Sequence, residues 1–97
     1  MDEETEEPMV IDLNETLREI NGALGDPTDR VIEECAELIV ALQHWKRNRV
    51  GLAALEEEMA DVLFTIGRLM QYHRCEVDVE ERVNETATRL WCQHVRR

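Results

Sequence analysis

Apolar side chains recur every three or four positions along the chain from Val10 onward. This spacing places them on one face of an α-helix, whereas a half-buried strand needs strict alternation. The β-branched residues nowhere alternate over a useful length, so no strand is expected. The apolar stripes predict four helices, which run from Leu13 up to Gly25, from Pro27 to about Arg49, from Leu52 to His73, and from Asp78 to His94.

Capping residues support three of these helix starts. Asp12 and Asp78 each stand three residues before a glutamate, which is the spacing of a capping box. Asp26 offers an N-cap before the second helix, with Pro27 at the first helical position. The connections are therefore short, which favours antiparallel neighbours and a helical bundle.

The length of the chain limits it to one small domain. A chain of 97 residues buries a modest share of its surface, so it is marginally stable as a monomer. The apolar stripes are also broader than one small bundle can hide. We therefore expect an all-α fold, a four-helix bundle completed by oligomerisation, in which the second and third helices pack across the subunits of a dimer or tetramer. The additional apolar residues beside the main stripes are Ile32, Ile39, Leu63 and Met70.

The charge of the chain excludes two classes of partner. The formal net charge is −11, from 22 acidic and 11 basic residues. This balance argues against binding to nucleic-acid backbones and to anionic membranes, which both attract basic surfaces. Residues 2–7 contribute −5 of this charge, which predicts an acidic disordered tail over residues 1–9 and a single helical domain over residues 10–97.

Two further features indicate where the protein works. No apolar run approaches 18 residues and no signal peptide is recognisable, so we expect neither a membrane span nor export. The three cysteines are odd in number and lack C-x-x-C spacing, which indicates reduced thiols. We therefore expect a cytoplasmic protein.

Two segments of the expected second and third helices resemble each other. Residues 34–39 and 58–63 both read acid, any residue, alanine, acid and two aliphatic residues. Side chains three residues apart on a helix have Cβ atoms about 5–6 Å apart on one face. Both acid pairs interrupt an apolar face, whereas a merely solvated acid belongs on the opposite side. The four acids are Glu34, Glu37, Glu58 and Asp61.

Antiparallel packing of these helices would bring the four carboxylates into one small volume. Such a cluster repels itself unless a hard divalent cation binds it, and all-oxygen ligands suit Mg²⁺ or Mn²⁺ better than zinc. The alternative is that the acids form the edge of a polar face. A ferritin-like di-iron site needs Glu-x-x-His pairs, and no histidine here stands three residues after a glutamate.

The acidic pattern also resembles a known family. Glu33-Glu34-x-x-Glu37, followed by Glu58-x-x-Asp61, resembles the E-x-x-E and E-x-x-D signature of the MazG-like all-α nucleoside triphosphate pyrophosphohydrolases. The segments VIEECAELIVAL and LEEEMADVLFTI resemble the two central helices of that family, and CEVDVEERV resembles the turn into its next helix. The resemblance covers roughly Leu13 to Trp91.

This resemblance implies a MazG-like helical bundle that hydrolyses an NTP or dNTP to the monophosphate and pyrophosphate with Mg²⁺. By that likeness, the metal ligands are Glu34, Glu37, Glu58 and Asp61. A water held by the metal and a carboxylate would be the nucleophile, with Glu34 or Glu33 as the catalytic base. Two alternatives stay open, namely a phosphoribosyl-ATP pyrophosphatase-like enzyme and a non-catalytic helical oligomer with a regulatory or scaffold role.

The residues that bind the substrate are marked less clearly. Arg82 and Arg89 correspond to basic positions of a K-x-x-x-N-x-x-K/R pattern in the family, although both also serve to balance an acidic surface. Arg68 is a third candidate for phosphate binding, because it lies on the acidic side of the third helix. His44 lies on the same helical stripe as Glu34 and Glu37. Its side chain is expected to face either the pocket beside these acids or solvent. The candidates for stacking on a base, or alternatively for the core or a subunit interface, are Trp45, Phe64, Tyr72 and Trp91.

Overall fold

The computed structural model describes residues 12–96, and these residues form helices without any strand. The all-α expectation is therefore confirmed for this part of the chain. The expected acidic tail at residues 1–9 lies outside the described residues. The four helices are α2 (Leu13–Leu24), α3 (Thr28–Lys46), α4 (Leu52–His73) and α5 (Glu76–Val95).

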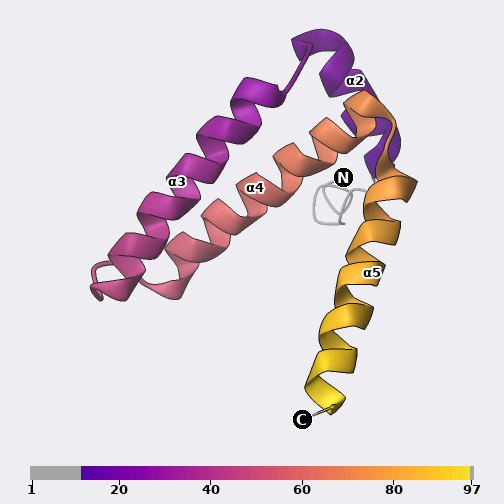
Figure 1. Ribbon diagram of the computed structural model, residues 1–97. Helices are drawn as coiled ribbons and strands as arrows, with labels where there is room; N and C mark the ends of the chain where they lie inside the picture. Colours follow the sequence, from indigo (N-terminus) through magenta and orange to yellow (C-terminus); the bar gives the residue numbers. More distant parts are fainter. Residues whose placement is uncertain (1–11, 97) are drawn as a thin grey trace, which may run out of the picture.

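The helices α3 and α4 form an antiparallel hairpin that is the centre of the molecule (Figure 1). Helix α2 packs on α4 at the end where α3 begins and α4 ends. Helix α5 starts from the same end, contacts only α4 among the described helices, and runs away from the hairpin (Figure 1). Within residues 12–96, the helices therefore do not close into a four-helix bundle. Completion of the bundle by further copies stays a prediction.

Helix α3 ends at Lys46, earlier than the sequence predicts. Asn48 has a left-handed backbone with φ of 59°, which ends the helical path. The N–H groups of Arg47 and Arg49 both donate to the carbonyl of His44, so the last turn folds back on itself. The chain then enters α4 after a short connection, as expected for antiparallel neighbours.

Helix starts follow the capping prediction at Asp12 and differ from it at Asp26 and Asp78. The carboxylate of Asp12 accepts a hydrogen bond from the Glu15 N–H at 3.2 Å, as a cap of α2. The predicted N-cap Asp26 accepts from both the N–H and the hydroxyl of Thr28. However, Pro27 is the N-cap of α3 and Thr28 is its first residue, so the helix starts one residue later than expected.

The predicted cap at Asp78 is wrong, because α5 begins at Glu76 and Asp78 lies inside its first turn. The cause is the sharp end of α4, where Arg74 has a left-handed φ of 54° and the Cys75 N–H donates to Met70. The acids Glu76 and Asp78 then interact favourably with the positive end of the α5 dipole.

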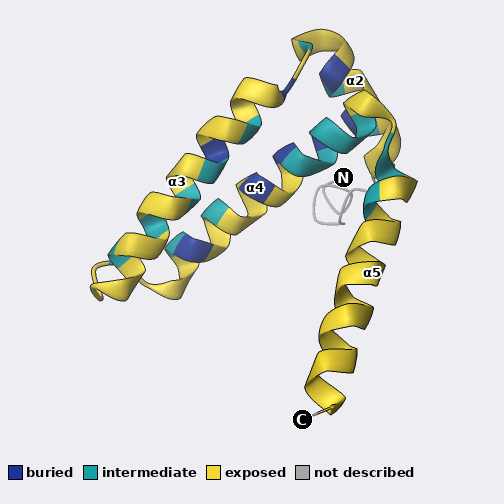
Figure 2. Ribbon diagram, in the orientation of Figure 1, coloured by how far each residue is buried: buried dark blue, intermediate teal, exposed yellow. Residues whose placement is uncertain are grey.

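The core is small and lies along the seam between α3 and α4 and between α4 and α2. Leu17 from α2 packs against α4 beside Gly67, where an added Cβ would lie 3.5 Å from the Leu17 Cδ1. Figure 2 shows buried residues on α2, α3 and α4, while α5 is exposed after its first turns. The expected buried stripe of α5 is therefore exposed within one chain from Val83 onward, because α5 diverges from the hairpin. The buried apolar residues are Leu17, Pro27, Leu55 and Val62.

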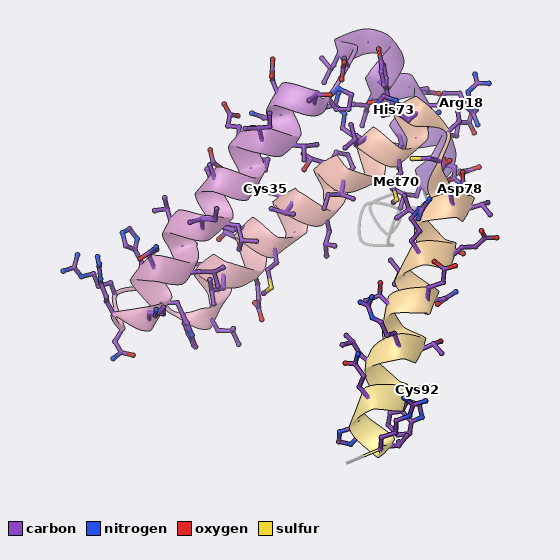
Figure 3. All side chains as sticks on the ribbon, viewed as in Figure 1. Arg18, Cys35, Met70, His73, Asp78 and Cys92 are labelled. Carbon is purple, nitrogen blue, oxygen red and sulfur yellow. The ribbon has the colours of Figure 1, made fainter. Side chains whose placement is uncertain are left out.

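Within residues 12–96, no helix combines the length and the apolar character needed to cross a membrane. The three cysteines are free thiols. Cys92 is exposed near the far end of α5, away from the other helices (Figure 3), whereas Cys35 and Cys75 are half-buried.

Candidate metal centre between α3 and α4

Three of the four predicted metal ligands meet between α3 and α4. Glu34 and Glu37 project from α3 and Glu58 projects from α4, and each offers a carboxylate oxygen within 4.8 Å of the others. The three-residue spacing places the α3 pair on one face, and the antiparallel hairpin places Glu58 opposite. This distance suits ligands that share one cation.

Two oxygens of this cluster are buried and lack hydrogen-bond partners. Glu34 is only 7% exposed and Glu58 is half-buried. The Oε1 atoms of both residues have no donor within the described part of the chain. A buried carboxylate oxygen without a donor costs free energy, so the arrangement fits a positive ligand at this point.

The fourth predicted ligand, Asp61, lies outside the group of three but acts on the same site. It borders a cavity together with Glu34. Burial raises the pKa of Glu34 above its ordinary value, and the negative charges of Glu37 and Asp61 raise that pKa further. Arg30 opposes this shift only in part. The electrostatic cluster therefore includes all four acids on the α3–α4 seam.

The acids lie between two cavities along this seam. A cavity of about 470 Å³ extends towards the α3–α4 turn, and Glu37 and Glu58 border it. A second cavity of about 370 Å³ extends towards α2, and Glu34 and Asp61 border it. We call them the turn cavity and the α2 cavity. The seam positions follow a spacing of three and four residues through both cavities, namely 30, 34, 37, 41 and 44 on α3 and 54, 58, 61, 65 and 68 on α4.

Of the two predicted candidates for the catalytic base, Glu34 and Glu33, the second borders the turn cavity together with Glu37 and Glu58. Its side chain is exposed and forms an ion pair with Arg30. Arg30 also approaches Glu34, with its Nε 3.4 Å from Oε2. Arg30 was not among the predicted site residues, although its spacing of three and four residues before these glutamates is the usual signal for helical ion pairs.

Arg68 lies close to the acids, but its guanidinium also has a structural role. The side chain is 5% exposed and borders the α2 cavity. Its Nε donates to Asn21 Oδ1 at 2.9 Å, and its Nη2 donates to the Gly25 carbonyl at 3.4 Å. Asn21 is itself buried, and the sequence marks it only as a polar residue within the apolar stripe of α2.

The other predicted substrate-binding residues, Arg82 and Arg89, lie on α5. Both are exposed, and neither borders the turn cavity or the α2 cavity. Arg82 instead borders an apolar hollow of about 460 Å³ on α5 itself, beside Val79 and Val83. One chain therefore does not bring these arginines to the acids.

Of the predicted candidates for contact with a base, two border the cavities beside the acids and three do not. His44 is half-buried and borders the turn cavity. Phe64 is 41% exposed and borders the α2 cavity. The remaining aromatic side chains are exposed and border neither cavity, namely Trp45, Tyr72 and Trp91.

Comparison with known proteins supports the resemblance found in the sequence. The family model of the MazG nucleotide pyrophosphohydrolase domain matches residues 27–94, which is more than half of the chain. The match contains α3, α4 and most of α5, together with all the acids of the cluster, and it leaves out α2. No curated protein and no solved structure matches the chain.

Proposed function

The chain belongs to the family of MazG nucleotide pyrophosphohydrolase domains, and we propose that it hydrolyses an NTP or dNTP to the monophosphate and pyrophosphate. The observation that carries this proposal is the pair of buried, unpartnered oxygens on Glu34 and Glu58 within the carboxylate cluster. Nucleoside triphosphates bind to enzymes as complexes with divalent cations. These carboxylates offer the hard oxygen ligands that Mg²⁺ or Mn²⁺ prefers.

The proposed ligands of Mg²⁺ are Glu34, Glu37, Glu58 and Asp61, of which the first three have oxygens within 4.8 Å of one another. The cation would neutralise the polyphosphate charge and lower the pKa of a bound water. Burial of Glu34 without a sufficient counter-charge means that the carboxylates repel one another. These residues therefore form a site that is prepared for a cation before the substrate arrives.

Glu33 is the proposed catalytic base, with Glu34 as the second candidate. Glu33 borders the turn cavity beside two of the proposed metal ligands, and its exposure leaves it open to water. Its ion pair with Arg30 holds the carboxylate on this side of α3. Glu34 is buried among the other acids, so its role as a metal ligand competes with a role as base.

Arg68 is the proposed phosphate contact on the hairpin. Its guanidinium is buried and borders the same cavity as Glu34 and Asp61. Arg82 and Arg89 remain candidates only if α5 of a second copy carries them to the acids. The exposed apolar side of α5 supports such a homo-oligomer, because Val83 and Leu90 are 59% and 55% exposed.

The test is hydrolysis of a panel of ribonucleoside, deoxyribonucleoside and modified triphosphates with Mg²⁺, with separate detection of pyrophosphate and phosphate. We expect pyrophosphate and the monophosphate. Glu58→Gln should lower kcat by about two orders of magnitude, because it removes a charge from the metal site. The matched control is Glu56→Gln, an exposed glutamate on α4 that borders neither cavity.

Three results would contradict this proposal. Release of phosphate instead of pyrophosphate would assign a different reaction to the site. Absence of hydrolysis across the panel, together with a melting temperature that is indifferent to Mg²⁺ and EDTA, would favour the non-catalytic helical oligomer. Turnover of phosphoribosyl-ATP alone would favour the related pyrophosphatase.

A further inference from the structure

The α2 cavity has a wall that the family match does not include. Ile20 and Leu24 of α2 border this cavity, whereas the match begins at residue 27. The other bordering residues come from α3 and α4, namely Arg30, Glu34, Asp61, Phe64, Thr65 and Arg68. A helix outside the matched region therefore shares a cavity with two of the proposed metal ligands.

The lining of this cavity is apolar on the α2 side and charged on the hairpin side. Leu24 is 69% exposed and Phe64 is 41% exposed, so both present uncovered apolar surface to it. Arg30 and Arg68 supply positive charge, while Glu34 and Asp61 supply the link to the metal cluster. A volume of about 370 Å³ falls within the range of small-molecule sites, which combine apolar walls with a few polar groups.

The turn cavity has a different chemistry. It is larger, at about 470 Å³, but its lining contains no arginine, lysine or phenylalanine. Small aliphatic residues cover most of it, with Glu33 and His44 as the polar residues beside the acid cluster. The α2 cavity is therefore the better match to a molecule with a flat apolar ring at one end and phosphates at the other.

Two buried side chains fix α2 in this position. Arg68 Nε donates to Asn21 Oδ1 at 2.9 Å, and Asn21 Nδ2 donates back to the Arg68 carbonyl at 2.9 Å. The same amide group donates to Gln71 Oε1 at 2.8 Å. Asn21 follows Ile20 directly in α2 and lies one turn before Leu24. The side chain that borders the acids therefore also sets the position of the apolar wall.

We propose that α2 is the specificity-determining wall of the site. Ile20 and Leu24 contact the nucleoside part of the substrate, whose phosphates lie at the acid cluster, and Asn21 is a positioning residue that acts through Arg68. This inference rests on the proposed function, because it assumes a nucleotide substrate. It adds that discrimination between nucleosides depends on a helix that the family match does not cover.

The experiment compares a nucleotide with a ligand that has no nucleoside. The KM is measured for the preferred triphosphate, and inorganic tripolyphosphate serves as a competitive inhibitor under the same Mg²⁺ concentration. Leu24→Ser should raise the nucleotide KM by about tenfold, as expected for lost apolar contact in a pocket, and leave the tripolyphosphate Ki unchanged. The matched control is Leu13→Ser, because Leu13 is an exposed leucine of α2 that borders a different cavity.

Asn21→Ala provides the second variant, because it loosens α2 without changing the wall itself. We expect its nucleotide KM to rise more than its tripolyphosphate Ki, with the helical circular dichroism signal retained. Equal rises of KM and Ki in both variants would reduce α2 to a general support and overturn the proposal. An unchanged nucleotide KM in Leu24→Ser would overturn it as well.

Size-exclusion chromatography tests the remaining alternative, in which Leu24 contacts a second copy of the chain and not the nucleoside. A change of elution volume in Leu24→Ser would assign this leucine to contact with a second copy and overturn the proposal. Failure of the proposed function gives a different result, because the unmodified protein would then release no pyrophosphate from any nucleotide. If the unmodified protein is active and the Leu24 and Asn21 variants keep its nucleotide KM, only the proposed role of α2 is contradicted, and the proposed function stands.

Discussion

The α3–α4 hairpin and α5 differ in the kind of group that each leaves without a partner within one chain. The hairpin buries Glu34 and leaves oxygens of Glu34 and Glu58 without donors, so its carboxylates are short of positive charge. Helix α5 has no such buried polar group, but it exposes an apolar hollow around Val79, Val83 and Leu90. The carboxylates of the hairpin are therefore not fully compensated by positive charge, and the apolar side of α5 is not covered.

This difference predicts two separate partners for the two regions. A small divalent ion satisfies the hairpin, because charge and oxygen ligands determine its affinity. Another protein surface satisfies α5, because apolar area determines association there. Changes in the hairpin should therefore affect metal binding and chemistry, whereas changes in α5 should affect assembly.

The largest expected effect is on catalysis by the hairpin. Glu37→Gln should lower kcat by about two to three orders of magnitude, because it removes charge from the proposed metal site. Glu85→Gln on α5 also removes one exposed carboxylate and should change kcat less than about twofold. Steady-state assays with circular dichroism as a folding check measure both effects. Comparable losses in the two variants would mean that α5 contributes to the site as much as the hairpin does.

The next effect is on assembly through α5. Leu90→Asp places a charge on the exposed apolar hollow, which should raise the dissociation constant of a homo-oligomer by about a hundredfold or more. Thr88→Asp adds the same charge to α5 outside this hollow and serves as the control. Light scattering coupled to size-exclusion chromatography measures the mass. A mass that stays unchanged on dilution of Leu90→Asp would locate the subunit contact elsewhere.

A smaller effect is stabilisation by the metal. At a free Mg²⁺ concentration tenfold above Kd, binding adds about 1.4 kcal/mol to the free energy of unfolding. For a domain of this size, that corresponds to a melting temperature roughly 5–10 °C higher. Glu34→Gln should remove most of this rise, whereas Leu90→Asp should retain it. A KCl control at equal ionic strength separates specific binding from screening of the acidic surface.

The smallest effect is the pH dependence of the metal-free protein. Burial and then the charges of Glu37 and Asp61 raise the pKa of Glu34 above 4.5 in the folded protein. The folded state therefore holds this proton more tightly than the unfolded state does. The contribution of Glu34 to stability is then highest below pH 4.5 and falls as the pH rises through the raised pKa.

Melting temperatures measured in EDTA between pH 4 and 7 test this contribution. Glu34→Gln has no such titration, so its melting temperature should fall less than that of the unmodified protein across this range. Identical pH profiles for the two proteins would contradict an unfavourable charge on Glu34. Saturating Mg²⁺ should reverse the slope, because a metal ligand must be deprotonated.

The parts of the fold that follow from local periodicity were predictable. The apolar spacing located all four described helices, and the acid pairs located the seam at which Glu34, Glu37 and Glu58 meet. These features depend on residues close together in sequence, or on one short turn between neighbouring helices. The family match at residues 27–94 confirms the resemblance that the acid pattern suggested.

The parts that depend on contacts between distant residues were not predictable. The bond between Asn21 and Arg68 joins residues 47 positions apart, and a single asparagine in an apolar stripe does not indicate its partner. The direction of α5 depends on Arg74, a non-glycine residue in a left-handed conformation that composition does not signal. The cap predicted at Asp78 is wrong for the same reason, because the end of α4 decides where α5 begins.

The bonds between α2 and α4 also affect where this protein can be divided. Family similarity begins at residue 27, yet Leu17 and Asn21 are buried against α4. Removing residues 1–26 would take away the Asn21 and Gly25 acceptors of Arg68. The guanidinium of Arg68, which is buried in the full chain, would then be exposed to water. The packed unit is therefore larger than the matched domain, and a boundary drawn at residue 27 would separate α2 from the helix that it packs against.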